Sequence, residues 1–232
     1  MILYGHGTFL ASVAASRENS EYIGSAPDAE LIVVKLKRAA PFFYNLYSIP
    51  EAQENAFLTI DVMLAIEYMI GKSNELRMPI SICIALGTNM GGHDGFDILG
   101  QYMSEVSRIT GVCICAAAGN ESNKRLHASG IITHSLSAQD IQIRVPENAN
   151  SFIFSIWTNP PDRMSVSLKS PTNEIVPRAP AISGAITQTR LILERSTVIV
   201  QYFFPVTGSG AQVITVHILD PTPRYMDYYV IW

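Results

Sequence analysis

The hydrophobic pattern of this 232-residue chain changes its period near residue 137. Before that point, residues 30–36, 79–87 and 111–117 form nearly continuous apolar runs, as strands buried on both faces do. Residues 56–76 and 96–109 carry apolar side chains at helical spacing. Strands that alternate with helices form a parallel sheet covered on both faces. The pattern therefore predicts an α/β domain over residues 1–136.

After residue 137, apolar and polar side chains alternate, as they do in half-buried antiparallel strands. Strands are predicted over residues 141–145, 151–157, 164–168, 190–194, 197–204 and 212–219. Short strands separated by turns indicate an all-β sandwich of the jelly-roll type over residues 137–232. A sandwich cut before its last strand would expose unpaired backbone. We therefore expect this part to be stabilised by a second copy or by strand exchange, or else to be poorly stable.

The first motif places His6 between Gly5 and Gly7, at the start of a helical pattern that runs to Ser16. Small residues on most faces of this pattern predict a helix packed tightly inside a domain. The two glycines let backbone and substrate come close to the imidazole. Alone, this pattern is more typical of a structural histidine than of a catalytic one, so the role of His6 depends on the other motifs in the chain.

Composition narrows the class of protein. Hydrophobic residues make up 48% of the chain and charged residues 16%, which allows a substantial core. The formal net charge of −4 argues against nucleic-acid and membrane partners. Three cysteines, Cys83, Cys113 and Cys115, lie in apolar runs, and we expect them to be buried and reduced. We expect Cys113 and Cys115 to point to opposite faces of a strand, and predict no metal site.

Four segments in a fixed order resemble the subtilisin-like serine proteases (peptidase family S8). They are residues 5–8 with the helix that follows, 26–29 leading to Val34 and Lys35, 85–87, and 117–120. Any one segment is a weak signal, but the ordered set is specific and covers roughly residues 1–135. The sequence is most similar to the Csp-type germination proteases of clostridia, which carry a jelly roll inserted before the nucleophile. The turn at residues 88–95 is also similar to theirs.

The resemblance implies a role for each matched residue. His6 would be the general base, and Asn120 would donate its side-chain amide to the oxyanion of the tetrahedral intermediate. An extended protein or peptide substrate would pair by backbone hydrogen bonds with Ala85, Leu86, Gly87, Ala118 and Gly119. The family also implies calcium binding, for which no site is identified. It further implies a bacterial, secreted or spore-associated location, although no targeting motif is visible in the sequence.

The departures from the family limit the function. The family's catalytic aspartate lies well upstream of its histidine, but only five residues precede His6 and none is acidic. The nucleophile of the family lies in a Gly-Thr-Ser segment, which is absent here. Ser183 and Ser209 are rejected because no small-residue helix follows them. We therefore predict an incomplete protease chain that does not hydrolyse peptides by itself.

Two other functions remain open. The chain could belong to a catalytically inactive relative that uses the fold as a binding or sensing module. The sandwich could also be an independent carbohydrate- or protein-binding module, although Trp157 is more typical of a packing residue than of a ligand platform. His93 and Asp94 could suggest a metal site or a proton relay, but their spacing favours a turn held by the aspartate side chain.

Overall fold

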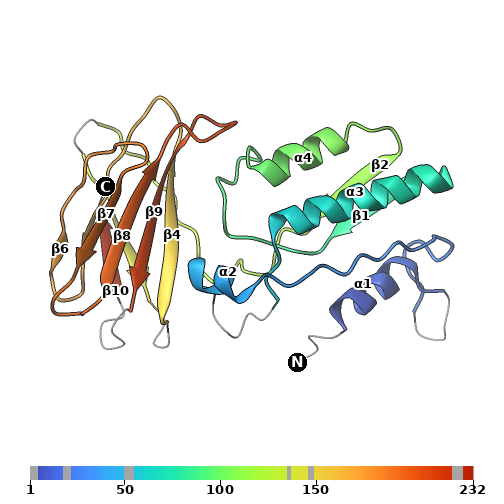
Figure 1. The fold of residues 1–232 in the computed structure, drawn as a ribbon, viewed down its shortest axis with the longest axis horizontal. Helices are drawn as coiled ribbons and strands as arrows, with labels where there is room; N and C mark the ends of the chain where they lie inside the picture. Colours follow the sequence, from blue (N-terminus) through green and yellow to red (C-terminus); the bar gives the residue numbers. More distant parts are fainter. Residues whose placement is uncertain are drawn as a thin grey trace.

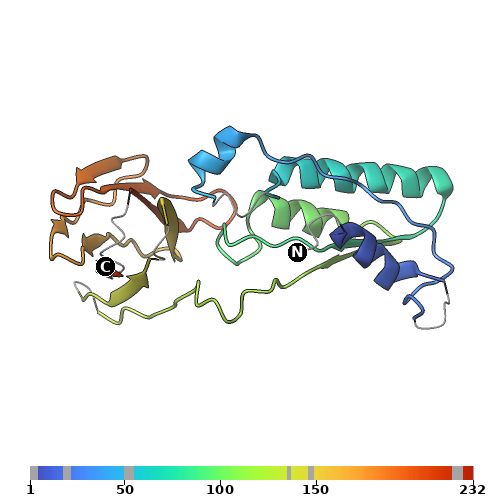
Figure 2. The same ribbon diagram turned by 90° about the horizontal axis from the view of Figure 1, so that it is seen from below.

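The computed structural model describes residues 5–17, 22–49, 55–134, 137–145, 149–220 and 227–231, the last range by its backbone. An α/β unit comes first and an all-β unit second, side by side along the long axis (Figures 1 and 2). The helices are α1 (His6–Ala15), α2 (Pro41–Leu46), α3 (Thr59–Leu76) and α4 (Ile98–Val106). None of the described helices combines the length and apolarity needed to cross a membrane.

The α/β unit is built on two parallel strands, β1 (Ile80–Ile84) and β2 (Val112–Ala116). Ile66 of α3, Ile82 of β1 and Val106 of α4 form its buried core, so α3 and α4 cover one face of the pair. Asp97 caps α4 because its carboxylate accepts the N–H groups of Leu99 and Gly100. Figure 1 shows α1 on the side of the strands away from α4.

Two expectations for the α/β unit are wrong. Helix α1 has no buried residue: residues 24–26 bond to its last turn, but 66% of the Phe9 surface is exposed. Residues 30–36 run extended but belong to no sheet among the described residues. Leu31 and Val33 are 53% and 70% exposed, whereas Ile32 and Val34 are half-buried. The segment therefore has the shape of a strand without a neighbouring strand.

The cysteines also differ from the prediction. All three thiols are exposed and free. Cys83 pairs with Cys115 in register, and a hydrogen bond to Cys113 raises the pKa of the Cys115 thiol. Cys113 and Cys115 share a face because side chains two residues apart on a strand point the same way. The expectation of opposite faces counted the strand period incorrectly.

The all-β unit consists of two antiparallel four-stranded sheets over a common core. One sheet has the order β3 (Asp140–Arg144), β10 (Asp227–Ile231), β5 (Ser167–Lys169) and β6 (Ile175–Val176). The other has the order β4 (Ser151–Thr158), β9 (Gln212–Leu219), β8 (Thr197–Phe203) and β7 (Ile186–Arg190). The last strand, β10, therefore lies inside its sheet, between β3 and β5, rather than at an open edge.

The predicted strand at residues 190–194 is wrong beyond Arg190, which ends β7, because residues 191–196 form the turn between β7 and β8. The Glu174 carboxylate accepts the backbone N–H groups of Ile192 and Leu193, at 2.9 and 2.8 Å. Buried Glu194 accepts the N–H and hydroxyl of Thr172. The two glutamates thus tie two turns together. The strand predicted at 164–168 is observed as β5, which begins at Ser167.

The two units contact each other across the outer face of the β4–β9 sheet. The Ser48 hydroxyl lies 2.7 Å from Nε2 of His217 on β9, and burial lowers the pKa of this histidine. A Cβ atom on Gly92 would lie 3.1 Å from the Trp157 ring on β4, so the indole packs directly on the glycine. Trp157 therefore is a packing residue, as expected, but at the junction of the units and not in the sandwich core.

Candidate functional site

The candidate site lies where β1 and β2 end. The N–H of Ala117 donates to the carbonyl of Ile84 at 3.0 Å, which holds the two strand ends together. A Cβ atom on Gly87 would lie 3.9 Å from Cα of Gly119, so the two backbones are almost in contact. Gly119 has a φ of +87°, which favours glycine. The structure thus brings residues 85–87 and 118–119 together.

The far end of this pair of segments is open to solvent. Ala85 is half-buried, whereas Leu86, Gly87, Ala118 and Gly119 are exposed. Asn120 is exposed as well, and no described residue bonds its carboxamide. Exposed backbone beside a free carboxamide is an arrangement that can pair with an extended chain and donate to a carbonyl oxygen.

A hydrogen bond that the sequence does not predict stabilises this end. Nδ2 of Asn89 donates to the Glu121 carboxylate at 2.7 Å, between residues 32 apart in the chain. This bond joins the loop after β1 to the segment after β2. No periodicity or spacing in the sequence marks such a pair.

His6 is the first residue of α1, and its side chain is exposed. Gly5 precedes it without a side-chain cap. Figure 1 shows the N-terminal end of α1 at the same end of the α/β unit as the carboxyl ends of β1 and β2. No contact joins His6 to Asn120 among the residues that the structure describes, and no described carboxylate bonds the imidazole.

The turn at residues 88–95 has the predicted construction. The Asp94 carboxylate accepts the N–H of Phe96 at 3.0 Å, which is the expected aspartate turn. The His93 ring meets the His127 ring edge to face, with 5.9 Å between centroids. In the described ranges no three His, Cys, Asp or Glu side chains are grouped to hold a metal ion.

Ser183 and Ser209, rejected as nucleophiles, form hydrogen bonds within turns. The Ser183 hydroxyl donates to the Phe204 carbonyl and accepts the N–H of the same residue. The Ser209 hydroxyl accepts the N–H of Ala211. Neither hydroxyl is bonded to a described histidine, so neither has the base that a nucleophilic serine needs.

Comparison with known proteins gives a structural likeness only. No family model and no curated relative matches the sequence. A solved structure, that of the Clostridium perfringens CspB protease, superimposes with a TM-score of 0.82 at 23% identity over 100% of this chain. The chain has a CspB-like fold. It spans 47% of the length of that CspB chain, so roughly half of the neighbour has no counterpart here.

Proposed function

We propose that this chain is part of a subtilisin-like serine endopeptidase. The observation that carries the proposal is the match of the whole chain to CspB, described as a protease, with the backbones of residues 85–87 and 118–119 side by side. Ala85, Leu86 and Gly87 pair with an extended peptide substrate as an added strand. Ala118 and Gly119 lie on the other side of this added strand.

In the proposed reaction Asn120 donates its side-chain N–H to the carbonyl oxygen of the scissile bond as that oxygen becomes negative. His6 takes the proton of a serine hydroxyl and returns it to the leaving amine. The serine and the carboxylate that orients His6 come from outside this chain, from the part of the protein that corresponds to the rest of CspB. The 232 residues alone are therefore predicted not to form an acyl-enzyme.

A fluorophosphonate probe tests both statements. The isolated chain should not be labelled, whereas the product of the complete reading frame should be, at one serine. In that longer protein, Asn120→Ala should lower turnover by about 10²–10³, because an oxyanion donor acts mainly in the transition state. His6→Ala should abolish labelling. Covalent labelling of the 232-residue chain would refute the proposal for the isolated chain.

A catalytically inactive relative is the second candidate. The two candidates differ in two features that this chain does not contain, a Gly-Thr-Ser segment and an acidic residue before His6. If the complete reading frame also lacks both, residues 85–87 would bind peptides without any cleavage. Peptide binding alone does not separate the candidates, because both would retain residues 85–87.

A further inference from the structure

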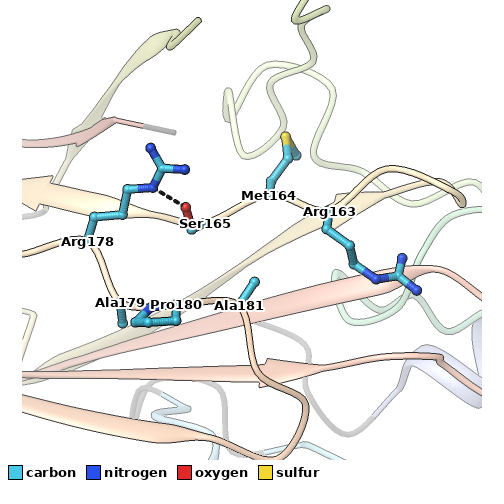
Figure 3. A pocket seen from close by; sticks show the side chains of 7 residues that line it. All are labelled: Arg163, Met164, Ser165, Arg178, Ala179, Pro180 and Ala181. Atoms are coloured by element: carbon cyan, nitrogen blue, oxygen red, sulfur yellow. Dashed lines mark hydrogen bonds between the residues drawn. The ribbon is translucent and has the colours of Figure 1, made fainter. Parts of the chain in front are cut away.

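A groove in the all-β unit lies away from the candidate site. It encloses about 290 Å³ between two extended arms of the chain, 163–165 and 178–181 (Figure 3). The arms continue the β5–β6 hairpin, in which Leu168 pairs with Val176, but beyond Ser167 and Val176 they belong to no strand. The groove is thus the opening of a hairpin whose arms diverge.

Buried polar side chains fix the positions of the two arms. The Gln212 amide accepts the N–H of Met164 at 2.7 Å and donates to its carbonyl at 2.8 Å, as a neighbouring strand would. The Tyr202 hydroxyl accepts the N–H of Val166 at 3.1 Å and donates to the carbonyl of Ala179 at 3.3 Å. Burial raises the pKa of this hydroxyl, so it stays protonated. The groove is therefore formed before any ligand arrives.

Two arginines stand at its ends, as Figure 3 shows. Nε of Arg178 donates to the Ser165 hydroxyl on the facing arm. The Arg163 guanidinium lies 4.5 Å from the centroid of the Phe204 ring, and its Nη1 donates to the carbonyl of Asp162 at 3.0 Å. Both side chains are thus held in place while their remaining N–H groups lie at an exposed surface. No Asp or Glu is among the seven described residues that line the groove.

We propose that this groove binds an extended acidic peptide segment, with one carboxylate at Arg163 and another at Arg178. Guanidinium groups recognise carboxylates through paired N–H donors. Cations at the two ends of a groove suit negative charges spaced along one extended chain. The small side chains of Ala179 and Ala181 leave room for the peptide backbone. Because both arginines are exposed, binding will be weak and sensitive to salt.

The test is fluorescence anisotropy at low salt with a labelled Gly-Glu-Gly-Glu-Gly peptide and its Gly-Gln-Gly-Gln-Gly counterpart. We expect the glutamine peptide to bind at least about tenfold more weakly, and Arg163→Gln and Arg178→Gln each to weaken binding by about three- to tenfold. Arg195→Gln, outside the groove, is the matched control and should bind as the wild type does. Far-UV circular dichroism verifies that each variant is folded.

Three results would overturn the proposal. Equal binding of both peptides would show that carboxylates are not recognised. An equal loss of affinity in Arg195→Gln would show that the overall charge of the protein, and not the groove, accounts for binding. Arginine-dependent binding of a sulfated oligosaccharide without binding of the glutamate peptide would assign the groove to another ligand. None of these results bears on the proposed protease site, which lies in the other unit.

Discussion

Replacing Tyr202 by phenylalanine removes one oxygen atom from the core of the all-β unit. The N–H of Val166 then loses its partner in a buried position, and the carbonyl of Ala179 loses its partner at the half-buried wall of the groove. An unsatisfied buried group costs about 1–3 kcal/mol, and the longer bond to Ala179 contributes less, so we expect a loss of about 2 kcal/mol in the free energy of unfolding. For a unit of this size, the same loss lowers Tm by about 10 °C.

Urea denaturation followed by far-UV circular dichroism measures the change. Tyr22→Phe is the matched control, because the Tyr22 hydroxyl donates to Val13 at 2.8 Å on the surface, where water replaces the lost bond. Its effect should stay below about 0.5 kcal/mol. A Tyr202→Phe variant as stable as this control would refute the view that the hydroxyl holds the arms of the groove. If the view is right, the same variant also binds the glutamate peptide more weakly.

Three further predictions test other contacts. Burial lowers the pKa of His217 below 6.5, so the unfolded chain takes up the proton first and stability falls as pH drops through 6.5. His217→Gln should reduce this decline in urea midpoints between pH 8 and 5, and an unchanged slope would contradict it. Burial alone would raise the pKa of Glu194, but hydrogen bonds from neighbouring hydroxyls bring it below 4.5, so its stabilisation is lost as pH falls below 4.5. Glu194→Gln should be less stable at pH 7 and lose less on acidification, and equal acid sensitivity would argue against this. Gly92→Ala places a Cβ atom 3.1 Å from the Trp157 ring and should destabilise the protein by about 1 kcal/mol. The control Gly71→Ala, in an open position within α3, should stabilise it by about 0.5–1 kcal/mol. Effects of the same sign on the free energy of unfolding would contradict the predicted clash.

The sequence predicts the strand ends at the candidate site because the carboxyl ends of neighbouring parallel strands meet at one edge of a sheet. The apolar runs at 79–87 and 111–117 therefore suffice to place Gly87 beside Gly119. The run at 30–36 has the same composition but forms no sheet, since a buried strand also needs neighbours that composition does not report. The tight packing expected of α1 fails for the same reason.

Contacts between distant side chains are not predictable in this way. The bond from Asn89 to Glu121 and the packing of Trp157 on Gly92 join residues whose local patterns are complete without each other. The turn at residues 191–196 is predicted as a strand because its apolar residues resemble those of a strand. The Glu174 and Glu194 carboxylates that hold this turn in place have no sequence spacing that would reveal their role. Roles for His6 and Asn120 stay predictions, since no contact between them is described.

The position of Trp157 has a practical consequence. Its indole reports on the boundary between the two units, because the ring packs on a glycine of the α/β unit. With Trp232 changed to phenylalanine, its emission would shift to longer wavelengths when the units separate, even while the sandwich stays intact. The protein thus carries an intrinsic optical sensor for separation of its halves, readable without any attached dye.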